Sequence, residues 1–194
     1  MKLEELADII VGQIMTRVTA DSNNEGKEIR VLSPKAISNG VIDMDDIGTT
    51  VVTKEIDKDK YTREGDVVIK LSTPYDAAYI TSESAGLAIP SFCAIIRLSG
   101  NCVSAGYLSA FLNSKYVKNQ LIAKVSGGIK PMVKVTDIRN LEFPTVSQSD
   151  MQDIGEAFLL SGKKKKALLE MIRTEEQTMS TIVMNSIIGG MRNE

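Results

Sequence analysis

The chain has 194 residues, of which 43% are hydrophobic and 25% charged, and its formal net charge is −2. This length and composition suit one globular domain with a core plus an appended element, and they exclude a disordered chain. Histidine is absent, which removes the commonest general base, the serine and cysteine triads that depend on it, and nearly all catalytic zinc arrangements. A binding protein is therefore favoured over an enzyme.

The N-terminal residues bear on the location of the protein, and the cysteines on metal binding. No run of 18 apolar residues occurs, and Glu4, Glu5 and Asp8 stand where a signal peptide would carry basic residues, so we expect a cytoplasmic protein without membrane association. Cys93 and Cys102 have no histidine to share a metal with, and we interpret both as structural. We expect no metal and no cofactor.

The first half of the chain alternates predicted strands with turns. Lys2–Ile10 is predicted as a short amphipathic helix, and Val11–Val18 either extends this helix or turns into a strand. Strands are then predicted from β-branched runs separated by turn residues such as Asn39-Gly40 and Glu64-Gly65. The predicted strands are Glu28–Leu32, Thr49–Thr53, Asp66–Leu71, Ala77–Thr81 and Ser91–Leu98.

Two acidic clusters lie between these segments. Asp43-Met-Asp-Asp46 and Glu55-Ile-Asp-Lys-Asp59 are interpreted as solvated turns, with a carboxylate metal site as the minor alternative.

The next part of the chain completes a mixed domain. Gly106–Val125 is predicted as one helix, and Val133–Pro144 as an extended segment that Pro144 closes. We therefore predict a mixed α/β (α+β) domain with a twisted sheet over residues 1–147.

The C-terminal part is predicted to be one long helix of the coiled-coil type, over residues 148–194. A capping sequence precedes it and no proline follows, although Gly155 and Gly162 are weak positions. A helix of about 35 residues is ~50 Å long, more than this domain can cover. Its apolar stripe therefore needs a partner helix, either from another chain, which would make a homodimer, or from Lys2–Ile10. The stripe comprises Met151, Ile154, Phe158, Leu168, Ile172, Met179 and Ile182.

A glycine loop flanked by lysines connects the domain's last elements. In Lys124-Val-Ser-Gly-Gly-Ile-Lys-Pro-Met132, Gly127 and Gly128 allow close approach of a partner, while Lys124, Lys130 and Lys134 supply positive charge. This combination suits a phosphate backbone. The alternative is a loop that only connects a helix to a strand.

Charge is distributed unevenly along the chain. Residues 1–83 hold ten Lys/Arg against sixteen Asp/Glu, residues 84–147 hold seven against two, and residues 148–194 hold six against seven. An anionic partner should therefore meet the middle third, from Arg97 to Arg139. The run Lys163-Lys-Lys-Lys166 is interpreted as a solvated helix face, with a nucleic-acid role as the alternative.

Several segments, taken in order, carry a resemblance to a known family. They are Glu28–Asp43, Glu64–Lys70, Thr73–Ile80, Tyr107–Ser114 and Ser126–Pro131. Together with the terminal helix, this succession resembles a target recognition domain of type I restriction-modification specificity subunits, and the resemblance covers nearly the whole chain. Such subunits usually carry two recognition domains and two long helices. This chain has one of each and resembles a half-subunit.

The resemblance implies a function and partners. In that family the recognition domain reads one half of a split target in double-stranded DNA, the long helix is a spacer, and the helices hold methyltransferase subunits, to which a restriction subunit can be added. The residues agree with a non-catalytic role, because methyl transfer would need an Asn/Asp-Pro-Pro-aromatic element and Thr73-Pro-Tyr75 has a single proline. The alternative is a dimeric protein-interaction or regulatory module that does not read DNA, which the acidic first 83 residues favour.

We expect the DNA contacts on two loops and their flanks. Phosphates would be met by the basic middle third, and base edges by polar side chains. For Tyr75 and Tyr79, half-buried sheet positions are an equal alternative to DNA contact. The candidate residues are Lys70, Ser72, Thr73, Tyr75, Asp76, Tyr79, Lys124, Ser126, Gly127, Gly128 and Lys130.

Overall fold

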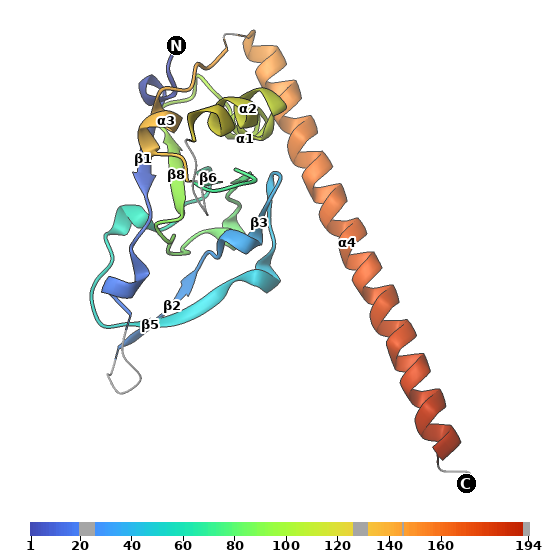
Figure 1. Cartoon of the computed structure of the whole chain (residues 1–194). Coiled ribbons are helices and arrows are strands. Elements are labelled where there is room, and N and C mark those ends of the chain that lie inside the picture. Colours follow the sequence, from blue (N-terminus) through green and yellow to red (C-terminus); the bar gives the residue numbers. More distant parts are fainter. Residues whose placement is uncertain (20–25, 126–131, 145, 192–194) are drawn as a thin grey trace.

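A four-stranded antiparallel sheet forms the centre of the domain in the computed structural model (Figure 1). The structure describes residues 1–19, 26–125, 132–144 and 146–191. The strands lie in the order β1 (Ala7–Val11), β8 (Cys93–Leu98), β6 (Val67–Lys70) and β7 (Ala77–Tyr79). Strands β6 and β8, which are separated along the chain by β7, thus lie side by side at the centre of the sheet.

Two smaller sheets and several short helical turns accompany this sheet. Two-stranded sheets are formed by β2 (Lys27–Val31) with β5 (Gly48–Val52), and by β3 (Ile37–Ser38) with β4 (Val41–Ile42). Single-turn 3₁₀ helices connect the strands at Leu3–Glu5, Met15–Arg17, Pro34–Ala36, Met44–Asp46, Lys58–Lys60 and Ser82–Ser84.

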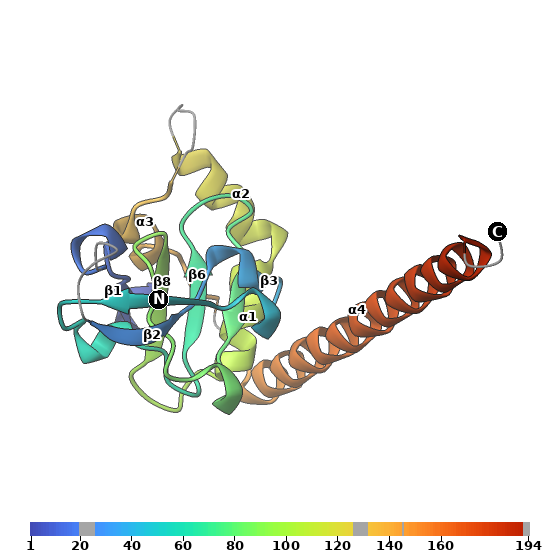
Figure 2. The same ribbon diagram turned by 90° about the horizontal axis from the view of Figure 1, so that it is seen from below.

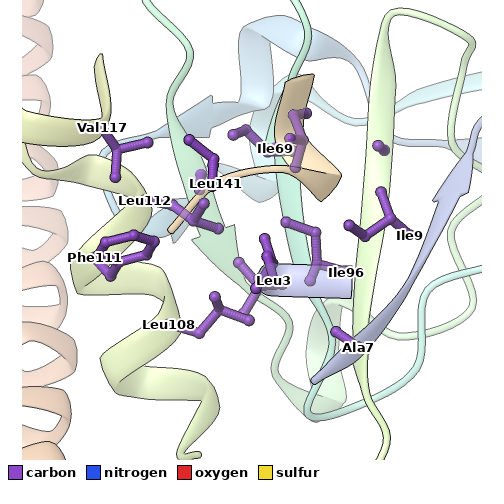
Figure 3. Close-up of a cluster of buried hydrophobic side chains, with 14 of the residues drawn as sticks. Leu3, Ala7, Ile9, Ile69, Ile96, Leu108, Phe111, Leu112, Val117 and Leu141 are labelled. Carbon is purple, nitrogen blue, oxygen red and sulfur yellow. The ribbon is translucent and has the colours of Figure 1, made fainter. Parts of the chain in front are cut away.

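The two faces of the central sheet are covered differently. On one face, helices α1 (Ala105–Asn113), α2 (Lys115–Lys124) and α3 (Val135–Arg139) contribute to a core with Ile69 and Ile96 (Figure 3). On the other face, Val68 and Ile95 pack with residues of β3 and β4 and of the loops that precede β3 and β8. Successive strand residues point to opposite faces, so a sheet covered on both sides needs continuous apolar runs such as Val67-Val-Ile69.

The predicted strands are confirmed, with boundaries shifted by at most two residues, whereas the predicted N-terminal helix is wrong. Lys2–Ile10 contains the 3₁₀ turn and most of β1, in which Ile9 pairs with Ile96. The β-branched run Ile9-Ile10-Val11 suits a strand, and pairing with β8 outweighs the helical spacing.

Two further segments differ from the prediction. The predicted helix Gly106–Val125 is divided at Ser114, whose backbone is extended and whose hydroxyl accepts a hydrogen bond from the N–H of Val117 at 3.2 Å, capping α2. The predicted extended segment Val133–Pro144 contains α3 instead.

Helix α4 (Gln148–Met191) runs past the domain and projects beyond it (Figures 1 and 2). Its 44 residues correspond to ~66 Å and occupy most of the predicted range 148–194. Its first half lies against α1 and β4, and all residues from Thr174 to Ile188 are exposed. Because Lys2–Ile10 is not a helix, it does not provide a partner helix for the stripe.

Candidate nucleic-acid interface

The connection between β6 and β7 is a tight turn at one end of the central sheet. The N–H of Tyr75 donates to the carbonyl of Ser72 at 2.9 Å, across a cis Thr73-Pro74 bond. Neighbouring segments fix the start of this turn, because Leu71 donates to the carbonyl of Phe92 at 2.9 Å and accepts from Val133 at 2.8 Å. The start of the turn is therefore held between two other segments of the chain, one at Phe92 and one at Val133.

Of the candidate residues in this turn, two present surface to a partner. Thr73 is exposed and Ser72 half-buried, and Tyr79 on β7 is half-buried too. Tyr75 is only 1% exposed and belongs to the core, and burial raises its pKa. Tyr75 therefore has no surface to offer DNA in this structure. The sequence-based alternative, a half-buried sheet position, matches Tyr79 on β7, whereas Tyr75 is fully buried in the turn.

Two charged candidates, Lys70 and Asp76, form a largely buried network with Lys118. The carboxylate of Asp76 accepts from Lys118 Nζ at 2.6 Å and lies 3.3 Å from Lys70 Nζ. Lys70 and Asp76 are each 9% exposed. Desolvation makes a buried charge costly unless it is paired, so these three residues stabilise the packing of α2 on the hairpin. This position does not favour Lys70 or Asp76 as direct base contacts.

Asn113, which the sequence-based prediction missed, positions the same hairpin. Its side-chain oxygen accepts from the N–H of Ala77 at 3.1 Å, and its amide nitrogen donates to the carbonyl of Ala77 at 2.8 Å. The amide thereby replaces a neighbouring strand at the edge of β7 and fixes α1 beside it. The only signal in the sequence is a polar residue at the end of an apolar helix, which many helices share.

Among the positive residues of the middle third that the structure describes, three are engaged by other groups of the fold. The guanidinium of Arg97 donates hydrogen bonds of 2.8 and 2.9 Å to the carboxylate of Asp66, and this interaction raises the pKa of Arg97. Lys118 is held by Asp76, and Arg139 donates to the carbonyl of Ile9 at 3.3 Å. The other cations in the described part of this region are the exposed Lys115, Lys124 and Lys134, which flank the hairpin through α2 and α3.

The glycine loop itself lies outside the described residues. This applies to Ser126, Gly127, Gly128 and Lys130. Lys124 is described, and it is exposed at the last position of α2. Met132 is bridged to Ser72, so the segment that follows the loop returns to the hairpin.

The proposed dimer residues on α4 fall into two groups. Phe158 lies against Gly40, where an added Cβ would be 2.6 Å from the ring, and Met151 packs against the core. These two residues contact the chain's own domain. The remaining five are between 44% and 61% exposed: Ile154, Leu168, Ile172, Met179 and Ile182.

Other kinds of site are missing from the residues that the structure describes. No group of three or more Cys, Asp or Glu side chains in these ranges is arranged to hold a metal ion. No helix within them is long and apolar enough to cross a membrane.

Comparisons with known proteins identify the fold. Neither a protein-family model nor a curated protein matches the sequence. The crystal structure of the HsdS subunit from Thermoanaerobacter tengcongensis matches with a TM-score of 0.62 and 16% identity, over 96% of this chain and 47% of that chain. The S subunit of the type I restriction-modification system from M. genitalium matches with a TM-score of 0.58 and 11% identity, over 91% and 42%.

A third structure concerns the complex assembly and conformational transition of a type I R-M system. It matches with a TM-score of 0.62 and 16% identity, over 97% of this chain and 47% of that chain. The chain thus spans about half the length of the structures that it matches. It has the fold of a specificity subunit of type I restriction-modification systems, in an α+β domain followed by one long helix.

Proposed function

We propose that this chain is a non-catalytic specificity subunit of a type I restriction-modification system that reads one half of a bipartite DNA target. The observation that carries this proposal is the shared fold over nearly the whole chain, including the long helix. The hairpin Ser72–Thr73 and the flanking Lys124 and Lys134 provide exposed polar and positive groups at one end of the sheet. Polar side chains of this kind contact base edges, while lysines contact phosphates.

The exposed half of α4 supports assembly as a homodimer. Large apolar side chains stay uncovered at Met179, Ile182, Val183 and Ile187, among others. A helix with such a stripe is stabilised by a second helix, and a second copy of this chain would supply the recognition domain that completes the length of the solved relatives. The two domains would lie further apart than the ~34 Å of one DNA turn, which suits two inverted half-sites separated by a spacer.

The same assembly would hold methyltransferase subunits, and a restriction subunit could join them. This is supported by the likeness to a structure that concerns complex assembly in a type I system. Catalysis would then belong to the partners. Incubating the pure chain with S-adenosylmethionine, or with magnesium and ATP, should leave plasmid DNA unchanged, and methylation or cleavage by the pure chain would contradict the non-enzymatic assignment.

A binding titration at two salt concentrations tests DNA recognition, with methyltransferase present because the net charge of −2 gives little long-range attraction. Lys124→Ala should weaken binding to every sequence alike and lower the salt slope by about 0.9 per lost phosphate contact. Thr73→Ala should instead cost roughly 1–3 kcal/mol on the preferred site only. The control is Lys54→Ala, an exposed lysine that follows β5.

A protein-interaction module that does not read DNA is the second candidate. It is favoured by the engagement of Arg97 and Lys118 within the fold, which leaves fewer exposed cations than the sequence suggests. If no DNA binding occurs with the methyltransferase present, this candidate replaces the first.

A further inference from the structure

The acidic turn Asp43–Asp46 and the basic side of α4 face each other. Arg173 donates to Asp43 Oδ2 at 2.8 Å and to Asp45 Oδ2 at 3.0 Å. On the domain side, Lys35 holds the third carboxylate, Asp46, at 2.6 Å. One guanidinium fork thus joins two carboxylates that lie 128 and 130 residues before it in the chain.

Closer to its start, α4 is attached by direct packing. Gly155 crosses Gly106 so tightly that a Cβ added to Gly155 would lie 2.7 Å from the backbone nitrogen of Tyr107. Further along the same helix, a Cβ on Gly162 would lie 2.8 Å from a methyl group of Val41. These contacts fix the position of the first part of the helix.

Between Gly162 and Arg173 the helix and the domain are not tightly packed. A hollow of about 310 Å³ lies there, lined from the helix by Lys165, Lys166 and Leu169 and from the domain by Val41 and Ile42. Apolar packing therefore contributes little to the attachment of this stretch. The contact of Arg173 with the acidic turn joins the helix to the domain beyond this hollow, just before the projecting part of α4 begins.

The contact of Arg173 lies far from the packed crossing at Gly155, so it has a large influence on the angle of the helix. Arg173 lies ~27 Å along the helix from Gly155, at ~1.5 Å per residue. Beyond it, Thr174 to Ile188 are all exposed. A contact at that distance from the packed crossing restricts the angle of the helix more than a contact of equal energy near the crossing would.

We propose that the contact of Arg173 with Asp43 and Asp45 fixes the angle between the recognition domain and α4, and thereby determines which spacing between half-sites the assembled subunit accepts. This inference rests on the proposed function, because a chain with one recognition domain meets two half-sites only as a DNA-reading dimer. Arg173 is in this sense a positioning residue for specificity: it acts on the arrangement of the two domains, and base readout stays with the domain itself.

The angle can be measured without DNA. Cys102 is exposed and takes a nitroxide label, whereas burial raises the pKa of the Cys93 thiol to about 12 and keeps it unreactive. A second label is placed on Thr181→Cys in the projecting half of α4, and labelled chains are diluted with unlabelled ones so that pulsed electron resonance records distances within one chain. Without further substitutions, the distribution of distances between the two labels should be narrow. Arg173→Ala should broaden this distribution, and so should the double substitution Asp43→Asn with Asp45→Asn.

Matched controls separate the contact from general charge effects. Lys164→Ala removes one positive charge from the same helix at an exposed position that does not line the hollow, and it should keep the narrow distance. Raising the salt concentration should broaden the wild-type distribution toward that of Arg173→Ala, because exposed ion pairs are screened. A distribution as narrow in Arg173→Ala as in wild type would overturn the proposal.

Spacing preference is then measured by titrating DNA with two half-sites whose spacer is varied one base pair at a time, with the methyltransferase present. Arg173→Ala should reduce the preference for the best spacer by up to about fivefold, the effect expected of one exposed ion pair, while binding of an isolated half-site stays unchanged. An unchanged spacer preference with a broadened distance would overturn the specificity role. Absence of DNA binding by the wild type would overturn the proposed function and this role together, and the distance measurement would still decide whether Arg173 fixes the angle.

Discussion

The two halves of α4 carry similar apolar residues, yet they differ in what covers them. In the first half, Phe158 lies on Gly40 and Gly155 meets Gly106, so the helix is part of the domain. In the second half, Met179, Ile182 and Ile187 are between 49% and 61% exposed. One periodic stripe can therefore serve two interfaces. Its first residues contact the chain's own domain, and its last residues are left for a partner.

The domain differs from the projecting helix in its charges as well. Asp76 is buried with Lys70 and Lys118, whereas the charges of the distal helix are solvated. Substitutions in the buried network, at the crossing and on the distal stripe should therefore affect stability to decreasing degrees.

The largest loss of stability is expected for Asp76→Ala. It leaves two largely buried ammonium groups without their shared carboxylate, which should lower the free energy of unfolding by roughly 3–5 kcal/mol. Lys118→Ala is the matched control and should cost less, since Asp76 keeps Lys70 as a partner. Chemical denaturation measures both. Unchanged stability with binding lost only on the preferred DNA site would instead identify Asp76 as a base-reading residue.

An intermediate effect is expected at the crossing of α1 and α4. Gly155→Ala places a methyl group 2.7 Å from the Tyr107 nitrogen and 2.8 Å from Ser104 Oγ, the cap of α1. Overpacking against backbone should cost about 1–3 kcal/mol, more than the ~1 kcal/mol that alanine gains over glycine in a helix.

Gly162→Ala provides the contrast on the same helix. Its new methyl group meets only a side-chain methyl of Val41, so the gain in helix propensity should offset most of the cost. The two variants are compared by thermal unfolding. Equal melting temperatures would show that the helix is not held at Gly155.

The smallest effect on stability is expected on the distal stripe. Ile182→Asp should change the free energy of unfolding of the domain by less than about 0.5 kcal/mol, because this side chain is exposed on the projecting half of the helix. It should nevertheless dissociate the proposed homodimer. Light scattering on wild type, Ile182→Asp and a chain ending at Arg173 measures this. A wild-type chain that is monomeric at high micromolar concentration would contradict the dimer.

Local patterns predicted much of the fold. β-branched runs between turn residues located the strands β2, β5, β6, β7 and β8, and the proline-free C-terminal stretch located α4. The N-terminal strand was missed because its apolar spacing fits a helix as well as a strand, and pairing with β8 decided between them. The break at Ser114 was missed because a serine cap inside a helical pattern resembles any other polar position.

For the candidate site, residue type could not reveal which of the residues are buried. Ser72 and Thr73 lie at the turn where the sequence placed them, whereas Tyr75 and Asp76 have the same polar character and are buried. Lys118 and Asp76 are 42 residues apart, and only the packing of α2 on the hairpin brings them together.

Propensity and periodicity act over a few residues, so the strands, the helices, the uneven charge distribution and the long terminal helix were predictable from local sequence. Contacts between distant residues depend instead on how the elements pack. Asp43 was interpreted as part of a solvated turn, and Gly155 as a weak position in a helix. Their contacts arise because α4 packs along the domain, which places residues far apart in sequence within hydrogen-bonding or van der Waals distance.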